Sequence, residues 1–129
     1  MATIAEIMSR GLLTVDPGVS LQDAARRMDE RHVGAALVLD GGALRGIVTE
    51  RDVLRAVAAG PIDGVSVADC MTRNPETIDA SESTGLAASL MIHGGFRHLP
   101  VLDGEQVVGI VSIRDLMRVT IDDETPRGA

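Results

Sequence analysis

The strongest constraint on the fold of this chain is an internal repeat. The sequence from Ile4 to Val57 aligns without a gap on the sequence from Val67 to Thr120, at an offset of 63 residues, and 19 of the 54 paired positions are identical. The match is densest where Gly46-Ile47-Val48-Thr49-Glu50-Arg51-Asp52 recurs as Gly109-Ile110-Val111-Ser112-Ile113-Arg114-Asp115. A repeat of this length predicts two related units that pack about a pseudo-twofold axis and present any binding site twice.

Each repeat shows the same order of secondary-structure signals. In the first, a short extended piece ends at Asp16-Pro17-Gly18, and Ser20 precedes a helix with apolar residues at helical spacing. Two apolar strands then flank the hairpin signal Asp40-Gly41-Gly42, and a final helix begins at Thr49 and stops before Gly60. A short helix with a capping-box pattern precedes each set, starting at Thr3 and at Ser66. The chain therefore reads as a mixed α/β (α+β) protein built from two β-α-β-β-α units.

Composition excludes several classes of partner. The formal net charge of −7 disfavours nucleic acid and anionic membranes, which both require a positive face. The single aromatic residue, Phe96, also argues against a single-strand binding platform, which depends on base stacking. Cys70 is the only cysteine, so an intramolecular disulfide is impossible. The start of the chain lacks a signal-peptide pattern, and no run of 18 apolar residues occurs, so we expect a cytoplasmic location.

The duplicated segment from glycine to aspartate is the best candidate for a site. It places a strand directly before a helix, whose first backbone N–H groups and positive dipole end favour an anion. Thr49 and Ser112 add hydroxyls, while Asp52 and Asp115 add carboxylates that accept hydrogen bonds from a ribose diol. The same Thr/Ser-x-x-Asp spacing also describes an ordinary capping box that needs no ligand. The glycine that opens each segment leaves room for either a ligand or a neighbouring strand.

These residues, at this offset, resemble the cystathionine β-synthase (CBS) domain, and the whole chain resembles a stand-alone tandem CBS pair, or Bateman-type module. The pattern that carries the resemblance is Gly-hydrophobic-hydrophobic-Ser/Thr-x-x-Asp after a strand, present in both repeats. It implies a first repeat at 1–60, a linker at 61–66, a second repeat at 67–121 and a polar tail at 122–129.

The resemblance implies an adenosyl ligand in clefts between the two repeats. Thr49, Asp52, Ser112 and Asp115 would contact its ribose and phosphate, and the first strands would hold the base. Arg51 and Arg114 would reach a phosphate, although an exposed helix position explains them equally well. A basic pair at the start of the second strand exists only in the second repeat, so the clefts are expected to differ. A solvated surface charge is the alternative for its arginine. The first-strand residues are Thr14, Val15, Thr77 and Ile78. The basic pair is Arg97 and His98, and Pro100 follows it in the same segment.

Function is expected to be regulatory rather than catalytic, because no nucleophile–base pair and no metal-ligand spacing is visible. The implied ligands are AMP, ADP, ATP, S-adenosylmethionine or NAD, with no required cofactor and no metal. The module would act in trans on an unknown effector protein and form a homodimer through apolar helix faces. The alternative is a structural or dimerisation module with empty clefts.

Overall fold

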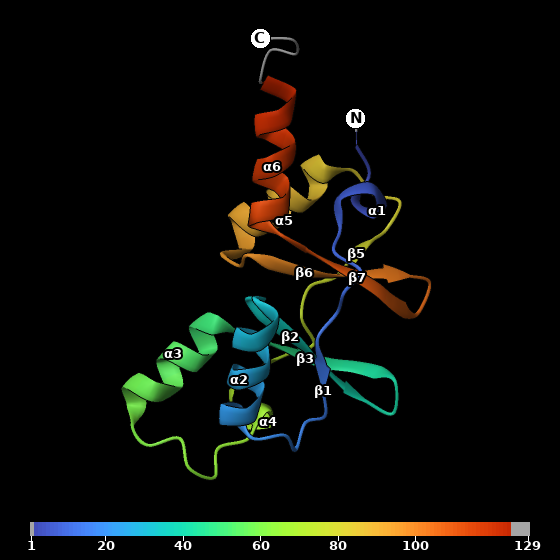
Figure 1. Cartoon of the computed structure of the whole chain (residues 1–129). Helices are drawn as coiled ribbons and strands as arrows, with labels where there is room; N and C mark the ends of the chain where they lie inside the picture. The colour runs from blue at the N-terminus through green and yellow to red at the C-terminus, as the bar shows by residue number, and fades with distance from the viewer. Residues whose placement is uncertain (1, 125–129) are drawn as a thin grey trace. The chain divides into compact units, whose positions relative to one another are not determined.

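The computed structural model describes residues 2–124, which form two compact units (Figure 1). One unit is continuous and runs from Leu12 to Pro75, and the other combines the residues up to Gly11 with those from Glu76 onward. Each unit contains one sheet and the helices that pack on it. The mixed α/β class and the repeated β-α-β-β-α order predicted from the sequence are confirmed.

The continuous unit holds a four-stranded sheet in the order β1-β2-β3-β4. Strand β1 pairs with β2 in parallel, whereas β2–β3 and β3–β4 are antiparallel. The hairpin turn lies at the predicted Asp-Gly sequence, with Gly41 at φ 60° and Gly42 at φ 83°, a left-handed conformation that glycine adopts readily. The elements are β1 (Thr14–Val15), α2 (Leu21–Arg31), β2 (Ala35–Asp40), β3 (Ala43–Thr49), α3 (Glu50–Ala59), α4 (Val67–Cys70) and β4 (Thr72–Arg73).

The second unit repeats this plan with a three-stranded sheet in the order β5-β6-β7. Its three helices lie on one side of that sheet (Figure 1). The last helix extends four residues beyond its expected end near Thr120, so the first part of the segment predicted as a polar tail is helical; residues 125–129 lie outside the described part. The elements are α1 (Ile4–Ile7), β5 (Ile78–Asp79), α5 (Thr84–Gly94), β6 (His98–Asp103), β7 (Gln106–Ser112) and α6 (Ile113–Glu124).

The short helix at the start of each sequence repeat packs in the unit of the other repeat. Ile4 of α1 is fully buried in the cluster that also contains Leu99 and Val111 of the second repeat. Reciprocally, Val67 of α4 is fully buried among residues of the first repeat. The residues after each short helix then join the same sheet: Thr72 pairs with Ile47 of β3, and Ser9 forms the equivalent bridge with Ile110 of β7. Each unit is therefore completed by a segment from the other sequence repeat.

Two glycines allow the segments that follow the short helices α1 and α4 to lie close to strands of the other sequence repeat. A Cβ on Gly46 would lie 2.7 Å from the carbonyl oxygen of Thr72, and a Cβ on Gly109 would lie 2.9 Å from the carbonyl oxygen of Ser9. Both distances are too short for a side chain, and the sulfur atoms of Met71 and Met8 also crowd the two positions. The sequence left open whether each glycine makes room for a ligand or for a neighbouring strand. The structure supports close approach of a neighbouring segment at both glycines.

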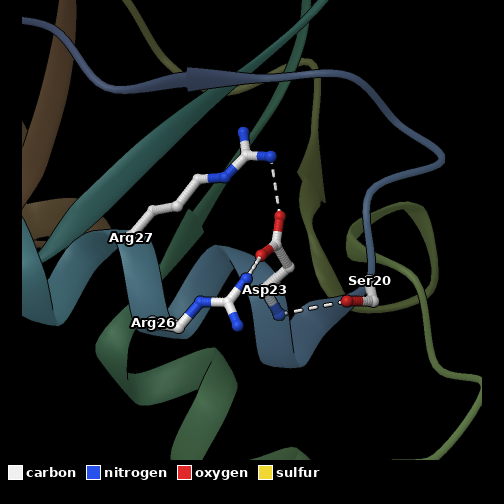
Figure 2. Close-up of polar contacts among 4 residues, drawn as sticks. All are labelled: Ser20, Asp23, Arg26 and Arg27. Carbon is white, nitrogen blue, oxygen red and sulfur yellow. Dashed lines mark hydrogen bonds and ion pairs between the residues drawn. The ribbon is translucent and has the colours of Figure 1, made fainter.

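Helix α2 is capped as its sequence predicts, and it carries a charge cluster that α5 lacks. The Ser20 hydroxyl accepts a hydrogen bond from the backbone N–H of Asp23 at 3.0 Å. The Asp23 carboxylate in turn holds Arg26 and Arg27, the latter at 2.7 Å (Figure 2). In α5 the positions of Asp23 and Arg27 are occupied by leucines, Leu86 and Leu90, so the two related helices present different surfaces.

The two helices also end differently. Both C-caps are left-handed, but α2 ends at His32 with φ 55°, whereas α5 ends at Gly95 with φ 73°. A left-handed conformation costs a residue with a Cβ about 1–2 kcal/mol. The first repeat therefore carries local backbone strain that the second repeat avoids.

Candidate functional site

The strand-to-helix junction between β3 and α3 forms a complete capping box. We call residues 34, 35 and 49–52 the α3 junction. The backbone N–H and the hydroxyl of Thr49 donate hydrogen bonds to Oδ2 of Asp52 at 2.8 and 3.1 Å. The N–H of Asp52 donates back to the Thr49 hydroxyl at 3.4 Å. Oδ1 of Asp52 has no hydrogen-bond partner among residues 2–124, so one carboxylate oxygen remains available.

The junction between β7 and α6 has nearly the same geometry. We call residues 97, 98 and 112–115 the α6 junction. Ser112 donates to Oδ2 of Asp115 from its N–H at 2.8 Å and from its hydroxyl at 3.0 Å, and the N–H of Asp115 donates to that hydroxyl at 3.2 Å. Here the other carboxylate oxygen lies 3.7 Å from Nη1 of Arg118, which partly occupies it. Sequence reasoning did not select Arg118, although its three-residue spacing from Asp115 is a signal for a helical ion pair.

The open row of backbone donors expected at these helix starts is mostly used internally. In the α6 junction the N–H of Ile113 donates to the carbonyl of Arg97 at 2.9 Å, and in the α3 junction the N–H of Glu50 donates to the carbonyl of Gly34 at 3.0 Å. Among the backbone N–H groups of residues 49–52, only that of Arg51 has no partner within residues 2–124. Among those of residues 112–115, the same holds only for Arg114.

The sheet register brings the basic pair of the second repeat to its helix start. His98 of β6 lies opposite Ser112 of β7, and the hydrogen bond from Ile113 fixes Arg97 beside the first turn of α6. Arg97 and Arg114 are both exposed, and His98 is half-buried. The matching pair in the first repeat, Gly34 and Ala35, has the same backbone contacts without any charge.

The first-strand candidates divide between surface and core. Thr14 is exposed and Thr77 half-buried, whereas Val15 and Ile78 are each 4% exposed and lie in the hydrophobic clusters of their units. Their side chains contribute to the packing of these clusters.

Pro100 is fully buried in the middle of β6, and it changes the neighbouring strand. In the first repeat the N–H of Leu37 donates to the carbonyl of Leu13 at 2.9 Å. Pro100 occupies the position equivalent to Leu37 and has no N–H to donate. Consistent with this, β5 begins at Ile78, one residue later than β1 begins in the aligned repeat.

Cys70, at the end of α4, is a half-buried free thiol. Burial raises the pKa of the Cys70 thiol above its ordinary value, and the negative charges of Asp69 and Asp52 raise it further. The reactive form of cysteine is the thiolate, which these effects disfavour.

No group of three or more His, Cys, Asp or Glu side chains within residues 2–124 is placed to hold a metal ion. None of the helices in this range is long and apolar enough to cross a membrane.

The family model of the CBS domain matches the chain twice, at residues 4–59 and 67–122. The chain therefore belongs to the CBS-domain family, as a tandem pair. Its fold is shared with a putative signal-transduction protein with CBS domains from Burkholderia ambifaria, with a TM-score of 0.90 and 34% identity over 99% of this chain and 100% of that one.

Two other relatives extend the comparison. The CBS domain-containing protein YhcV of Bacillus subtilis is 33% identical over 117 residues, which cover 90% of this chain and 84% of YhcV. The CBS domain pair of protein MJ0100, solved in complex with 5′-methylthioadenosine and S-adenosyl-L-methionine, gives a TM-score of 0.89 at 26% identity, covering 96% of this chain and 99% of that one. Related CBS pairs thus bind adenosyl ligands, and stand-alone proteins of this family are typically non-catalytic.

Proposed function

We propose that this protein is a regulatory ligand-sensing module that binds an adenine nucleotide or another adenosyl ligand at its strand-to-helix junctions and acts in trans on an effector protein. The ribose diol would donate to the carboxylates of Asp52 and Asp115, and the hydroxyls of Thr49 and Ser112 would lie beside the group attached to the ribose.

The observation that carries this proposal is the duplicated capping geometry. In both junctions one carboxylate oxygen is held by two hydrogen bonds; the other oxygen has no partner within residues 2–124 in Asp52 and lies 3.7 Å from Nη1 of Arg118 in Asp115. A fixed carboxylate loses little conformational entropy when it accepts hydrogen bonds from a diol, so it is suited to recognise ribose. The adenosyl ligands of the MJ0100 pair support the same class of ligand for this chain.

A thermal-unfolding panel with AMP, ADP, ATP, NAD, S-adenosylmethionine and 5′-methylthioadenosine tests the proposal. A ligand that binds only the native state stabilises it by about 2.7 kcal/mol when present at a hundredfold excess over Kd. Asp52→Ala and Asp115→Ala should each reduce the increase in Tm, whereas Glu105→Ala, an exposed carboxylate in the β6–β7 turn, should not. Absence of any increase at millimolar ligand would refute the binding function.

An apolar stripe on α6 favours a second role, homodimerisation, which is compatible with ligand binding. Ile113, Met117 and Ile121 recur every four residues and are 39%, 57% and 58% exposed, so one face of the helix presents continuous apolar surface. On α3, Leu54 is 69% exposed. Such a face favours association with a second copy. Sedimentation velocity should therefore give a dimer that Met117→Glu dissociates; a monomeric wild-type protein would refute this role.

A further inference from the structure

The two junctions carry opposite net charge, although their backbones match. The α3 junction holds two carboxylates, Glu50 and Asp52, against one guanidinium, Arg51. The α6 junction holds two guanidiniums, Arg97 and Arg114, against the single carboxylate of Asp115, with His98 in addition. The difference amounts to two unit charges at equivalent places in the two units.

The neighbouring charges do not cancel this difference. Arg55 on α3 has Arg118 as its equivalent on α6, and Glu6 on α1 has Asp69 as its equivalent on α4. Because these positions carry the same sign in both units, they affect the two junctions alike. The contrast of two unit charges comes from two differences between the repeats, Gly34 against Arg97 and Glu50 against Ile113, while His98 in place of Ala35 adds an imidazole.

Glu50 occupies the position where an added anion would be affected most. It is the first residue of α3, directly after the Thr49 cap, and its side chain is exposed. A carboxylate there already interacts with the positive end of the helix dipole, which a phosphate would otherwise use. Since most amides of the junction have internal partners, side-chain charge decides whether a phosphate is accepted. Two like charges within a few ångströms of each other disfavour binding.

We propose that ligand choice is divided between the two junctions, with Glu50 as the residue that excludes phosphate. On this proposal, which rests on the adenosyl-binding function above, the α6 junction takes adenosyl ligands that carry a phosphate, such as a nucleoside monophosphate. The α3 junction takes adenosyl ligands without one, such as a thioether nucleoside. One chain can then report on two chemically distinct members of the adenosyl class.

Isothermal titration with AMP and with 5′-methylthioadenosine tests the division of ligands. Asp52→Ala should remove 5′-methylthioadenosine binding and retain AMP binding, and Asp115→Ala should do the reverse. Circular dichroism and Tm of each variant without ligand establish that it is folded. AMP binding that survives Asp115→Ala and is lost in Asp52→Ala would overturn the proposal and leave the adenosyl-binding function intact. If neither ligand binds the wild-type protein, the division of ligands is refuted; the adenosyl-binding function is refuted only if the full thermal-unfolding panel also shows no increase in Tm.

Substitutions at Glu50 and at its equivalent, Ile113, test the role of Glu50. Glu50→Gln removes the charge at nearly constant shape and should tighten AMP binding at the α3 junction about three- to tenfold, leaving 5′-methylthioadenosine unchanged. Ile113→Glu should weaken AMP binding at the α6 junction by a similar factor; since Ile113 also belongs to the apolar stripe of α6, Met117→Glu, which changes that stripe outside the junction, is measured beside it. Glu30→Gln, at an exposed position of α2, is the matched control. Equal changes for both ligands in Glu50→Gln would show that Glu50 does not discriminate phosphate.

Discussion

Replacing Ile4 by alanine should destabilise the unit built from the second sequence repeat, not the repeat in which Ile4 stands. Ile4 is 0% exposed and lies against the buried residues of β6 and β7. The substitution removes three carbon atoms, worth about 0.8 kcal/mol each in lost transfer free energy. The cavity that remains adds to this, and measured losses for Ile→Ala in cores are about 2–5 kcal/mol. We therefore expect the free energy of unfolding of this unit to fall by about 3 kcal/mol.

Amide hydrogen exchange followed residue by residue measures this effect where it occurs. A loss of about 3 kcal/mol accelerates exchange limited by unfolding more than a hundredfold. The acceleration should appear in β6 and β7, with a smaller change in β2 and β3. Val67→Ala is the reciprocal variant, since Val67 is also 0% exposed but packs in the unit of the first repeat, and it should accelerate exchange in β2 and β3.

Two results would refute this reasoning. If Ile4→Ala accelerated exchange mainly in β2 and β3, the short helix would be packed with its own repeat. If each variant accelerated all four strands equally, the two hydrophobic clusters would not behave as separate cores, and unfolding would be a single event for the whole chain.

Three further substitutions or measurements follow from the fold. His32→Gly should raise the free energy of unfolding by about 0.5–1 kcal/mol in calorimetry, because relief of left-handed strain exceeds the entropy cost of glycine. Gly95→Ala should lower the free energy of unfolding. A loss of stability in both variants would contradict strain at His32. Gly46→Ala should cost about 1–3 kcal/mol in urea unfolding, since its Cβ would overlap the Thr72 carbonyl, whereas Gly18→Ala, in open space, should cost little; equal losses would refute close approach. The raised pKa of the Cys70 thiol predicts that iodoacetamide labelling of the native protein reaches half its maximal rate at a higher pH than labelling of the urea-unfolded protein. Because the unfolded thiol ionises first as pH rises, Cys70 lowers stability above its unfolded pKa; coincident labelling profiles would contradict the shift.

The repeat and the turn residues made most of the fold predictable. Asp40-Gly41 and Asp103-Gly104 marked both hairpins, which join β2 to β3 and β6 to β7. Ser20 capped α2 as its side chain predicts. These features were accessible because each depends on a local property, namely left-handed backbone at glycine or a hydroxyl at a helix start.

The exchange between repeats was not accessible from the sequence. Strand β4 has two residues, Thr72 and Arg73, both exposed, so no alternation of apolar side chains marks it. Its pairing with β3 is fixed by contacts at long sequence separation, on which local patterns carry no information. For the site, the spacing predicted the capping boxes of Thr49 and Ser112, but not that the carbonyls of Gly34 and Arg97 would take up a further amide at each helix start.

Completion of each unit by the opposite repeat sets an order for folding during synthesis. Residues 12–75 are contiguous, so that unit has all its parts once they have left the ribosome. Helix α1 is made earlier, but its binding surface on β7 is made more than 90 residues later, after Gln106–Ser112 has emerged. During that interval Ile4 and Met8 are apolar residues without their native partners, in a segment that closes the longest loop in the chain. Docking of the first helix therefore cannot precede the synthesis of β7, and conditions that delay it leave the edge of β7 open to pairing with another chain.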